Sequence, residues 1–282
     1  MITKIYPIDA GMFKLDGGAM FGVVPKTMWQ KLNPPDENNM CSWALRCLLI
    51  QTEDRNILVE TGMGHKQDEK FRAHFSPHGD GDLIPSLIKA GIQPEKITDV
   101  ILTHLHFDHC GGAVLRNKDG ELSPTFPFAR YWTHSTHWDW ANNPNDREKA
   151  SFLKENFMPL KEAGQLYFFD QLPHKDNWPE EIAIHLCNGH TEAMMVLEFN
   201  FDGVNYLYPA DLIPSSYHIP LPYIMAYDVR PLEAIKEKLQ LLELAVKNNS
   251  IIILEHDPTH TACSVHKNES GKIQIKQYFD LI

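Results

Sequence analysis

The chain has 282 residues, 43% of them hydrophobic and 22% charged, which is typical of a globular protein that can bury a sizeable core. Its net charge of −11 argues against a nucleic-acid partner, because a phosphate-tracking surface needs clustered basic side chains and the 26 Lys and Arg residues are scattered singly. No apolar run reaches the roughly 18 residues that a membrane helix needs, so we expect no membrane partner.

The first residues and the cysteines bear on the compartment. Residues 1–13 contain too short an apolar run for a signal peptide, and polar residues interrupt it. The five cysteines are odd in number and include no C-x-x-C pair, which is more typical of reduced thiols than of a disulfide framework. We therefore expect a cytoplasmic protein.

Apolar periodicity and turn residues predict many strands and two clear helices. Helices are expected at 83–90, which stops at Gly91, and at 231–247, where Pro231 occupies the first turn. The order fits an α/β protein with two mixed β-sheets packed face to face and helices outside, and we expect a single domain over 1–282. The expected strands are 2–9, 43–50, 56–60, 97–102, 129–133, 182–187, 194–199, 204–208 and 251–254.

A stretch at about 11–42 separates the first two strands. Gly and Pro residues punctuate it, and it carries many bulky apolar side chains. A loop of this length inside a compact domain is often a functional lid. We expect Phe21 and Trp29 to lie over a site and contact the acyl or aryl group of a small-molecule substrate. The alternative is that this stretch packs against the sheet or forms the interface of a homodimer.

The segment from Thr103 to His109 places three histidines and an aspartate within six positions, directly after an apolar strand. In an extended chain alternate residues face the same side, so His104 and His106 can reach one metal ion together. Asp108 and His109 lie past the expected bend, where they can reach a second ion. Imidazole and carboxylate are the ligands of a zinc site, and this density of them indicates a metal centre.

Three further ligand candidates also follow predicted strands. His190 comes after 182–187, Asp211 after 204–208 and His256 after 251–254. Residues that follow strand ends are where α/β proteins place many binding groups. We therefore expect these three side chains to complete a site of two metal ions.

The pattern H-x-H-x-D-H, followed by G-H-T, A-D and a late His, resembles the metallo-β-lactamase-fold hydrolases between about Trp43 and His256. The resemblance implies a four-layer αβ/βα sandwich that binds two Zn²⁺ ions, with iron or manganese as alternatives. It assigns His104, His106 and His190 to the first ion, Asp108, His109 and His256 to the second, and Asp211 to a bridge between them. Many members read Asp-Thr-Gly where this chain has Glu60-Thr61-Gly62, and that acid would support the ligands from behind.

Two metal ions that share a hydroxide would supply a nucleophile at neutral pH, so we expect a metal-dependent hydrolase, with Asp108 and Asp211 as catalytic residues. Asp108 is the candidate that protonates the leaving group. The chain is similar to N-acyl homoserine lactone lactonases and methyl-parathion-hydrolase-like proteins in its N-terminal insertion and in the block 210–214. We therefore expect an ester or lactone substrate, with Tyr217, His218 and Tyr223 as candidate donors to its carbonyl.

Other functions share the same ligand pattern. A phosphodiester or phosphotriester hydrolase, a thioester hydrolase of the hydroxyacylglutathione type, and a mononuclear iron persulfide dioxygenase are the enzyme alternatives. A structural zinc site is the non-enzymatic one. In the lactonases a tyrosine lies three residues after the bridging Asp, and this chain has Pro214 there. His134 and His137 form a further pair, which we interpret as lining and not as ligands because no matching acid accompanies them.

Overall fold

The computed structural model describes residues 1–171 and 177–281. Over these residues the chain divides into two compact units. Unit 1 comprises Met1–Gly11, Leu45–Ala73 and His78–Glu181, and unit 2 comprises Met12–Ala44, His74–Pro77 and Ile182–Ile282. The single-domain organisation stays a prediction. Among the described residues, none of the helices combines the length and the apolar character that crossing a membrane requires.

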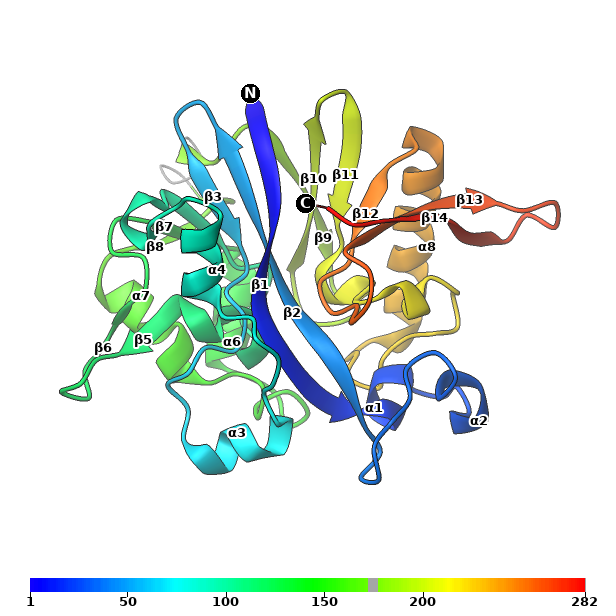
Figure 1. Ribbon diagram of the computed structural model, residues 1–282, viewed down its shortest axis with the longest axis horizontal. Helices are drawn as coiled ribbons and strands as arrows, with labels where there is room; N and C mark the ends of the chain where they lie inside the picture. Colours follow the sequence, from blue (N-terminus) through cyan, green and yellow to red (C-terminus); the bar gives the residue numbers. More distant parts are fainter. Residues whose placement is uncertain (172–176, 282) are drawn as a thin grey trace. The chain divides into compact units, whose positions relative to one another are not determined.

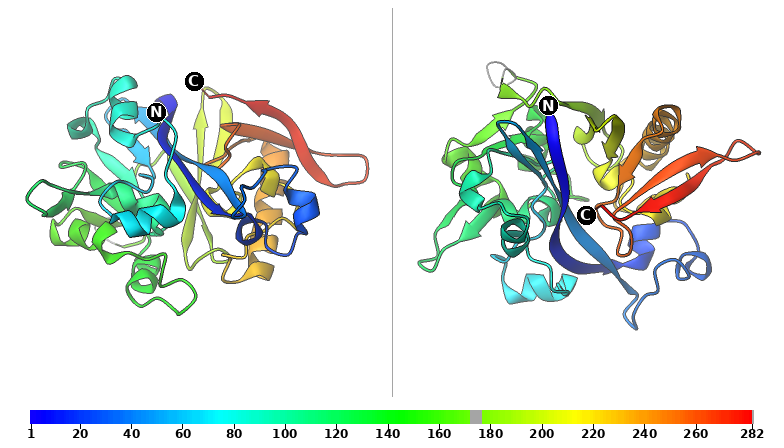
Figure 2. Two further views of the ribbon diagram at one scale, coloured as in Figure 1. Left: turned by 60° about the horizontal axis from the view of Figure 1, so that its bottom comes forward. Right: turned by 45° about the horizontal axis from the view of Figure 1, so that its top comes forward.

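The described residues form two six-stranded sheets and one small hairpin (Figures 1 and 2). The first sheet has the order β1-β2-β3-β4-β7-β8, and the second has the order β14-β13-β12-β11-β10-β9. Both contain parallel and antiparallel pairs, as the predicted mixed sheets require. The strands are β1 Ile2–Asp16, β2 Met40–Thr52, β3 Asn56–Val59, β4 Asp99–Ile101, β5 Val114–Arg116, β6 Leu122–Pro124, β7 Arg130–Thr133, β8 Leu166–Phe168, β9 Ile182–Cys187, β10 Met194–Phe201, β11 Val204–Tyr208, β12 Ile251–Ile253, β13 Ala262–Lys267 and β14 Ile273–Phe279.

Helices are mostly short, apart from α8. In unit 2, α8 begins at Pro231, whose missing N–H suits a first helical turn, ends before Asn249 in the left-handed conformation, and packs against β13. The α-helices are α1 Gly17–Phe21, α2 Lys26–Trp29, α3 Glu69–Phe75, α4 Leu83–Lys89, α5 Phe107–Cys110, α6 Ser135–Asn142, α7 Met158–Glu162 and α8 Pro231–Asn248. Short 3₁₀ turns are η1 Pro94–Lys96, η2 Gly111–Ala113, η3 Lys154–Asn156, η5 Ala210–Leu212 and η6 Ser216–His218.

The expectation of a long loop at 11–42 is wrong. Strand β1 continues to Asp16, and the two short helices α1 and α2 follow before β2 begins at Met40. The Asp16 carboxylate accepts the N–H of Ala19 at 2.8 Å and so caps α1. The Gly and Pro residues had suggested an extended lid. The chain forms these two helices instead, because they bury apolar side chains and that burial favours compact local structure.

The C-terminal hairpin β13–β14 was not predicted either. Its turn projects beyond the rest of unit 2 in Figures 1 and 2, and most β14 side chains are partly or fully exposed. Alternation of Ile273 and Ile275 with Gln274 and Lys276 is the signal that would have found this edge strand.

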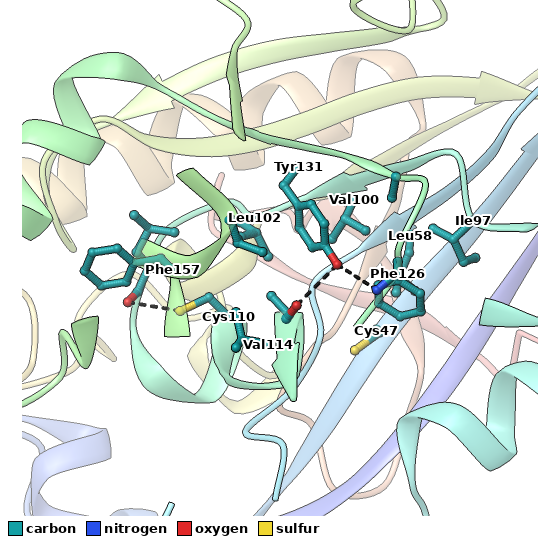
Figure 3. Close-up of a cluster of buried hydrophobic side chains, with 14 of the residues drawn as sticks. Cys47, Leu58, Ile97, Val100, Leu102, Cys110, Val114, Phe126, Tyr131 and Phe157 are labelled. Atoms are coloured by element: carbon teal, nitrogen blue, oxygen red, sulfur yellow. Dashed lines mark hydrogen bonds between the residues drawn. The ribbon is translucent and has the colours of Figure 1, made fainter. Parts of the chain in front are cut away.

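Figure 3 shows part of the core of unit 1, which includes Leu102 and Cys110, the core residues that flank the histidine-rich segment in the sequence. Tyr131 on β7 is buried there, and its hydroxyl donates to the carbonyl of Ala113 at 3.2 Å and accepts the N–H of Phe126 at 2.9 Å. Cys110 donates from Sγ to the carbonyl of Leu105 at 3.3 Å. Leu105 is itself a core residue, so the segment that carries the histidines is anchored in the apolar interior.

Candidate metal centre

Four predicted ligands lie together at the end of β4 in unit 1. The chain leaves β4 at Ile101, bends at Thr103 and His104, and enters the short helix α5, which carries Asp108 and His109, after the extended residue His106. All four side chains are buried. The ring of His104 lies 4.6 Å from that of His106 and 3.9 Å from that of His109, centroid to centroid, and His109 Nε2 lies 3.7 Å from an Asp108 carboxylate oxygen.

Glu60 belongs to the same cluster. One ligand atom from each of Glu60, His104 and His109 lies within 4.8 Å of the others. Glu60 Oε1 accepts the N–H of Thr103 at 2.8 Å and lies 3.9 Å from His109 Nδ1. Its backbone adopts a φ of +63°, a strained conformation for a residue other than glycine and one that is often found at functional sites. Glu60 has one methylene more than the usual Asp. Its carboxylate reaches both the backbone N–H of Thr103, directly before His104, and Nδ1 of His109.

His134, which precedes α6, and His137, which lies on it, make contacts other than metal binding. His134 Nδ1 accepts the N–H of Thr136 and caps the helix. His137 is fully buried, and its Nε2 accepts the N–H of Leu105 at 2.8 Å. Since Leu105 separates His104 from His106, His137 holds the backbone between two candidate ligands. The sequence gives no sign of this contact, because it joins residues that are 32 positions apart.

Unit 2 holds the other three predicted ligands. His190 follows β9, Asp211 lies in η5 after β11, and His256 follows β12. One carboxylate oxygen of Asp211 lies 3.2 Å from His190 Nε2, and the other lies 3.1 Å from His256 Nε2. All three side chains are buried. The carboxylate thus presents one oxygen to each imidazole, which suits a group that is shared between two cations.

The imidazoles of His190 and His256 are each oriented by a partner at Nδ1. His190 Nδ1 lies 3.0 Å from Asp228 Oδ1, and the other oxygen of Asp228 accepts the N–H of Met225. His256 Nδ1 donates to the carbonyl of Ala44 at 2.7 Å. Such partners fix the ring and leave Nε2 as the ligand atom, as is usual for histidines that bind metals. Asp228 could not be predicted from the sequence, because it neither follows a strand nor belongs to a motif.

Helix α8 positions the segment before His190. The Glu237 carboxylate accepts the N–H groups of Asn188 at 2.7 Å and Gly189 at 2.9 Å. Burial raises the pKa of Glu237, and the same two N–H groups oppose that rise. Arg230 donates its backbone N–H to the carbonyl of Gly189 at 2.9 Å. The turn that carries His190 is therefore held at several points to the start of one long helix.

Three of the expected substrate contacts are packed in the interior of unit 2. The ring of Phe21 is stacked between those of Trp29 and His218, with centroid distances of 5.3 and 5.1 Å. All three residues are buried, and His218 bonds through Nδ1 to Ser215 and donates through Nε2 to the carbonyl of Met20. Their observed role is to anchor α1, since neither the rings nor the nitrogens present an open surface.

Tyr217 and Tyr223 are only partly buried, so they remain the candidate donors to a substrate carbonyl. Burial raises the pKa of Tyr217, which keeps its phenol protonated and able to donate at neutral pH. In the N-terminal segment the exposed large apolar residues are Val23 at 90%, Met28 at 53% and Leu32 at 39%. The predicted contact with a substrate or with a second copy of the chain now depends on these three residues.

We expect His218 to make the protein sensitive to acid. Burial lowers its pKa from 6.5 to about 4, so between these values the unfolded chain binds a proton that the folded chain does not. Its contribution to the free energy of unfolding is complete above about pH 6.5 and is lost as the pH falls, by about 3 kcal/mol at pH 4.

Urea unfolding of chelator-treated wild type and His218→Phe, between about pH 7.5 and 4, measures this contribution. The variant should be less stable at neutral pH but should lose less stability on acidification. Parallel pH dependence in the two proteins would contradict the assignment.

The sequence matches the family model of the metallo-beta-lactamase superfamily over residues 46–256, which include both ligand clusters. The chain belongs to the metallo-beta-lactamase superfamily. The predicted family resemblance is confirmed at this level.

Individual curated relatives resemble the chain over only part of its length. An N-acyl homoserine lactonase of Bacillus cereus is 28% identical over 121 residues, which are 39% of this chain and 44% of that protein. The N-acyl homoserine lactonase AiiB of Agrobacterium fabrum is 25% identical over 149 residues, which are 49% of this chain and 53% of that one. The chain thus matches about half the length of these curated relatives.

Solved structures confirm the predicted fold class. A Staphylococcus aureus protein described as a probable metal-dependent hydrolase is 26% identical, with a TM-score of 0.86 over 99% of this chain and 96% of that one. The dizinc quorum-quenching lactonase AidC shares the fold at 20% identity, with a TM-score of 0.77 over 99% of this chain and 98% of that one.

The donor groups of this superfamily member fit metal ions. Each cluster consists of imidazole nitrogens and carboxylate oxygens, the donor types that zinc and neighbouring divalent metals accept. In His104, His190 and His256 it is Nδ1 that makes a hydrogen bond within the protein. This leaves Nε2 of each ring for a cation, which is the arrangement expected of a ligand.

Proposed function

We propose that the chain hydrolyses an ester or lactone bond of a small, partly apolar substrate, using two metal ions. The proposal assigns His104, His106 and His190 to one ion, Asp108, His109 and His256 to the other, and Asp211 to both. Its main support is the Asp211 carboxylate, whose two oxygens each lie within 3.2 Å of a different imidazole Nε2.

When bound, the two ions would supply a hydroxide nucleophile at neutral pH and stabilise negative charge that develops on the carbonyl oxygen. The chain itself orients the ligands through Asp228, the Ala44 carbonyl, Glu60 and His137. Asp108 is the proposed proton donor to the leaving alkoxide: it is a buried carboxyl group next to the ligand His109. Tyr217 and Tyr223 would donate to the substrate carbonyl.

Three observations favour an ester or lactone. The curated relatives that match are named N-acyl homoserine lactonases. The net charge of −11 disfavours a nucleic-acid substrate, and so weakens the case for a phosphodiesterase that acts on nucleic acid. A small substrate with an apolar acyl group also fits the partly exposed apolar residues of the N-terminal segment.

A substrate screen on metal-quantified protein tests the proposal. We expect close to two metal ions per chain and hydrolysis of lactones or esters, and we expect this hydrolysis to fall by at least about 10²-fold in His106→Ala because a ligand is lost. The panel should also contain thioesters, phosphotriesters and cyclic phosphodiesters. Turnover of phosphodiesters alone would overturn the substrate class, and one iron per chain with persulfide oxidation would replace hydrolysis by oxygenation.

A further inference from the structure

Glu148 is a buried carboxylate beside the histidine-rich segment of unit 1. It lies in the segment between α6 and η3 and is only 3% exposed. Its Oε2 accepts the indole N–H of Trp140 at 2.8 Å and the side-chain N–H of Asn145 at 2.6 Å. Its Oε1 lies 3.6 Å from His106 Nε2. The two donors on Oε2 hold the carboxylate in one orientation, with its other oxygen directed toward the imidazole.

We propose that Glu148 is a positioning residue for His106. The carboxylate favours the ring tautomer that carries its hydrogen on Nε2, which leaves Nδ1 as the atom that binds metal. This inference rests on the proposed function only in taking His106 as a metal ligand. Carboxylate–histidine–metal relays of this kind orient the ring and raise the basicity of the ligand nitrogen.

The cost of burying this carboxylate supports a specific role. A buried charge destabilises a fold unless hydrogen bonds or an opposite charge offset its lost hydration. Trp140 and Asn145 offset part of the cost at Oε2, and the Nε2–H group of a metal-bound His106, which carries partial positive charge, would offset it at Oε1. The ring of Phe152, 4.8 Å from that of His106, restricts the imidazole on another side.

Helix α6 therefore supports His106 in two ways. Its His137 fixes the backbone N–H of Leu105, directly before His106, and its Trp140 holds Glu148 against the His106 ring. His137, which the sequence led us to interpret as lining, therefore has a supporting role.

Zinc binding by Glu148→Ala, Glu148→Gln and Trp140→Phe tests the proposal, with Glu155→Gln as the matched control. Glu155 is a surface acid of the same region whose ion-pair partner is Arg116, so its variant should bind zinc as the wild type does. Affinity is measured by chelator competition, and the thermal midpoint of each metal-free variant is measured alongside. Absorption spectra of the cobalt-loaded proteins report the coordination geometry directly.

We expect Glu148→Ala to bind zinc about 10–100-fold more weakly, with an altered cobalt spectrum. Glu148→Gln keeps an acceptor oxygen and should lose less than about tenfold, since only the charge is removed. Trp140→Phe should shift affinity in the same direction. If Glu148→Ala does not fold without metal, the Gln and Phe variants decide the question.

Wild-type affinity and cobalt spectra in all three variants would overturn the positioning role. A metal-free thermal midpoint that falls while zinc affinity stays at the wild-type value would show that Glu148 is structural only, and would overturn it equally. A wild-type protein that binds no metal under the same conditions would instead contradict the proposed function.

Discussion

Asp211→Ala is expected to abolish hydrolysis. The Asp211 carboxylate lies within 3.2 Å of both His190 Nε2 and His256 Nε2, so its removal leaves two imidazoles without the group that links them. We expect a loss in kcat/KM of at least about 10³-fold, equivalent to about 4 kcal/mol of transition-state stabilisation, and a metal content of about one ion per chain or less. Steady-state kinetics with the lactone or ester found in the screen, together with metal analysis, measure both effects.

The exposed residue Asp119 provides the control for this experiment. Asp119→Ala removes the same side chain from a surface loop and should change neither metal content nor turnover. An Asp211→Ala protein that folds, retains two metal ions and keeps wild-type turnover would show that the carboxylate does not join the ions.

Gly189→Ala is expected to destabilise the protein strongly, although Gly189 is not a ligand. A Cβ at this position would collide with the backbone N and Cα of Ala234, in the first turn of α8, and would lie 2.7 Å from its Cβ. The helix backbone cannot move without breaking the bonds that Glu237 and Arg230 make to the same turn. We expect the free energy of unfolding to fall by about 3 kcal/mol, at the upper end of the range for overpacking. Because His190 is the next residue, zinc affinity should fall as well.

Gly203→Ala is the matched comparison, since it adds the same methyl group where no atom lies within 4 Å. Its φ of +77° makes the substitution mildly strained, at a cost of about 1 kcal/mol, and zinc affinity should stay unchanged. Denaturant unfolding and chelator competition on both variants give the two values. Equal free energies of unfolding for the two variants would show that α8 moves to accommodate the added Cβ, and would contradict the prediction.

The sequence predicted the parts of this protein whose determinants are local. The ligands of this segment occupy four of the six positions from His104 to His109, directly after an apolar strand, so the order of residue types alone indicates a metal site. Strand periodicity likewise located β2, β9, β10, β11 and β12, and Pro231 marked the start of α8. These features depend on neighbours within a few positions along the chain.

Tertiary structure alone decided which groups support the ligands. Asp228 lies 38 positions from His190, and Glu148 lies 42 positions from His106, so no local sequence pattern predicts either contact. It also placed Phe21, Trp29 and His218 in a buried stack, where composition had suggested a surface that meets substrate. Ligand identity follows from side-chain chemistry, whereas orientation and burial depend on contacts between distant segments, which exist only once the chain has folded.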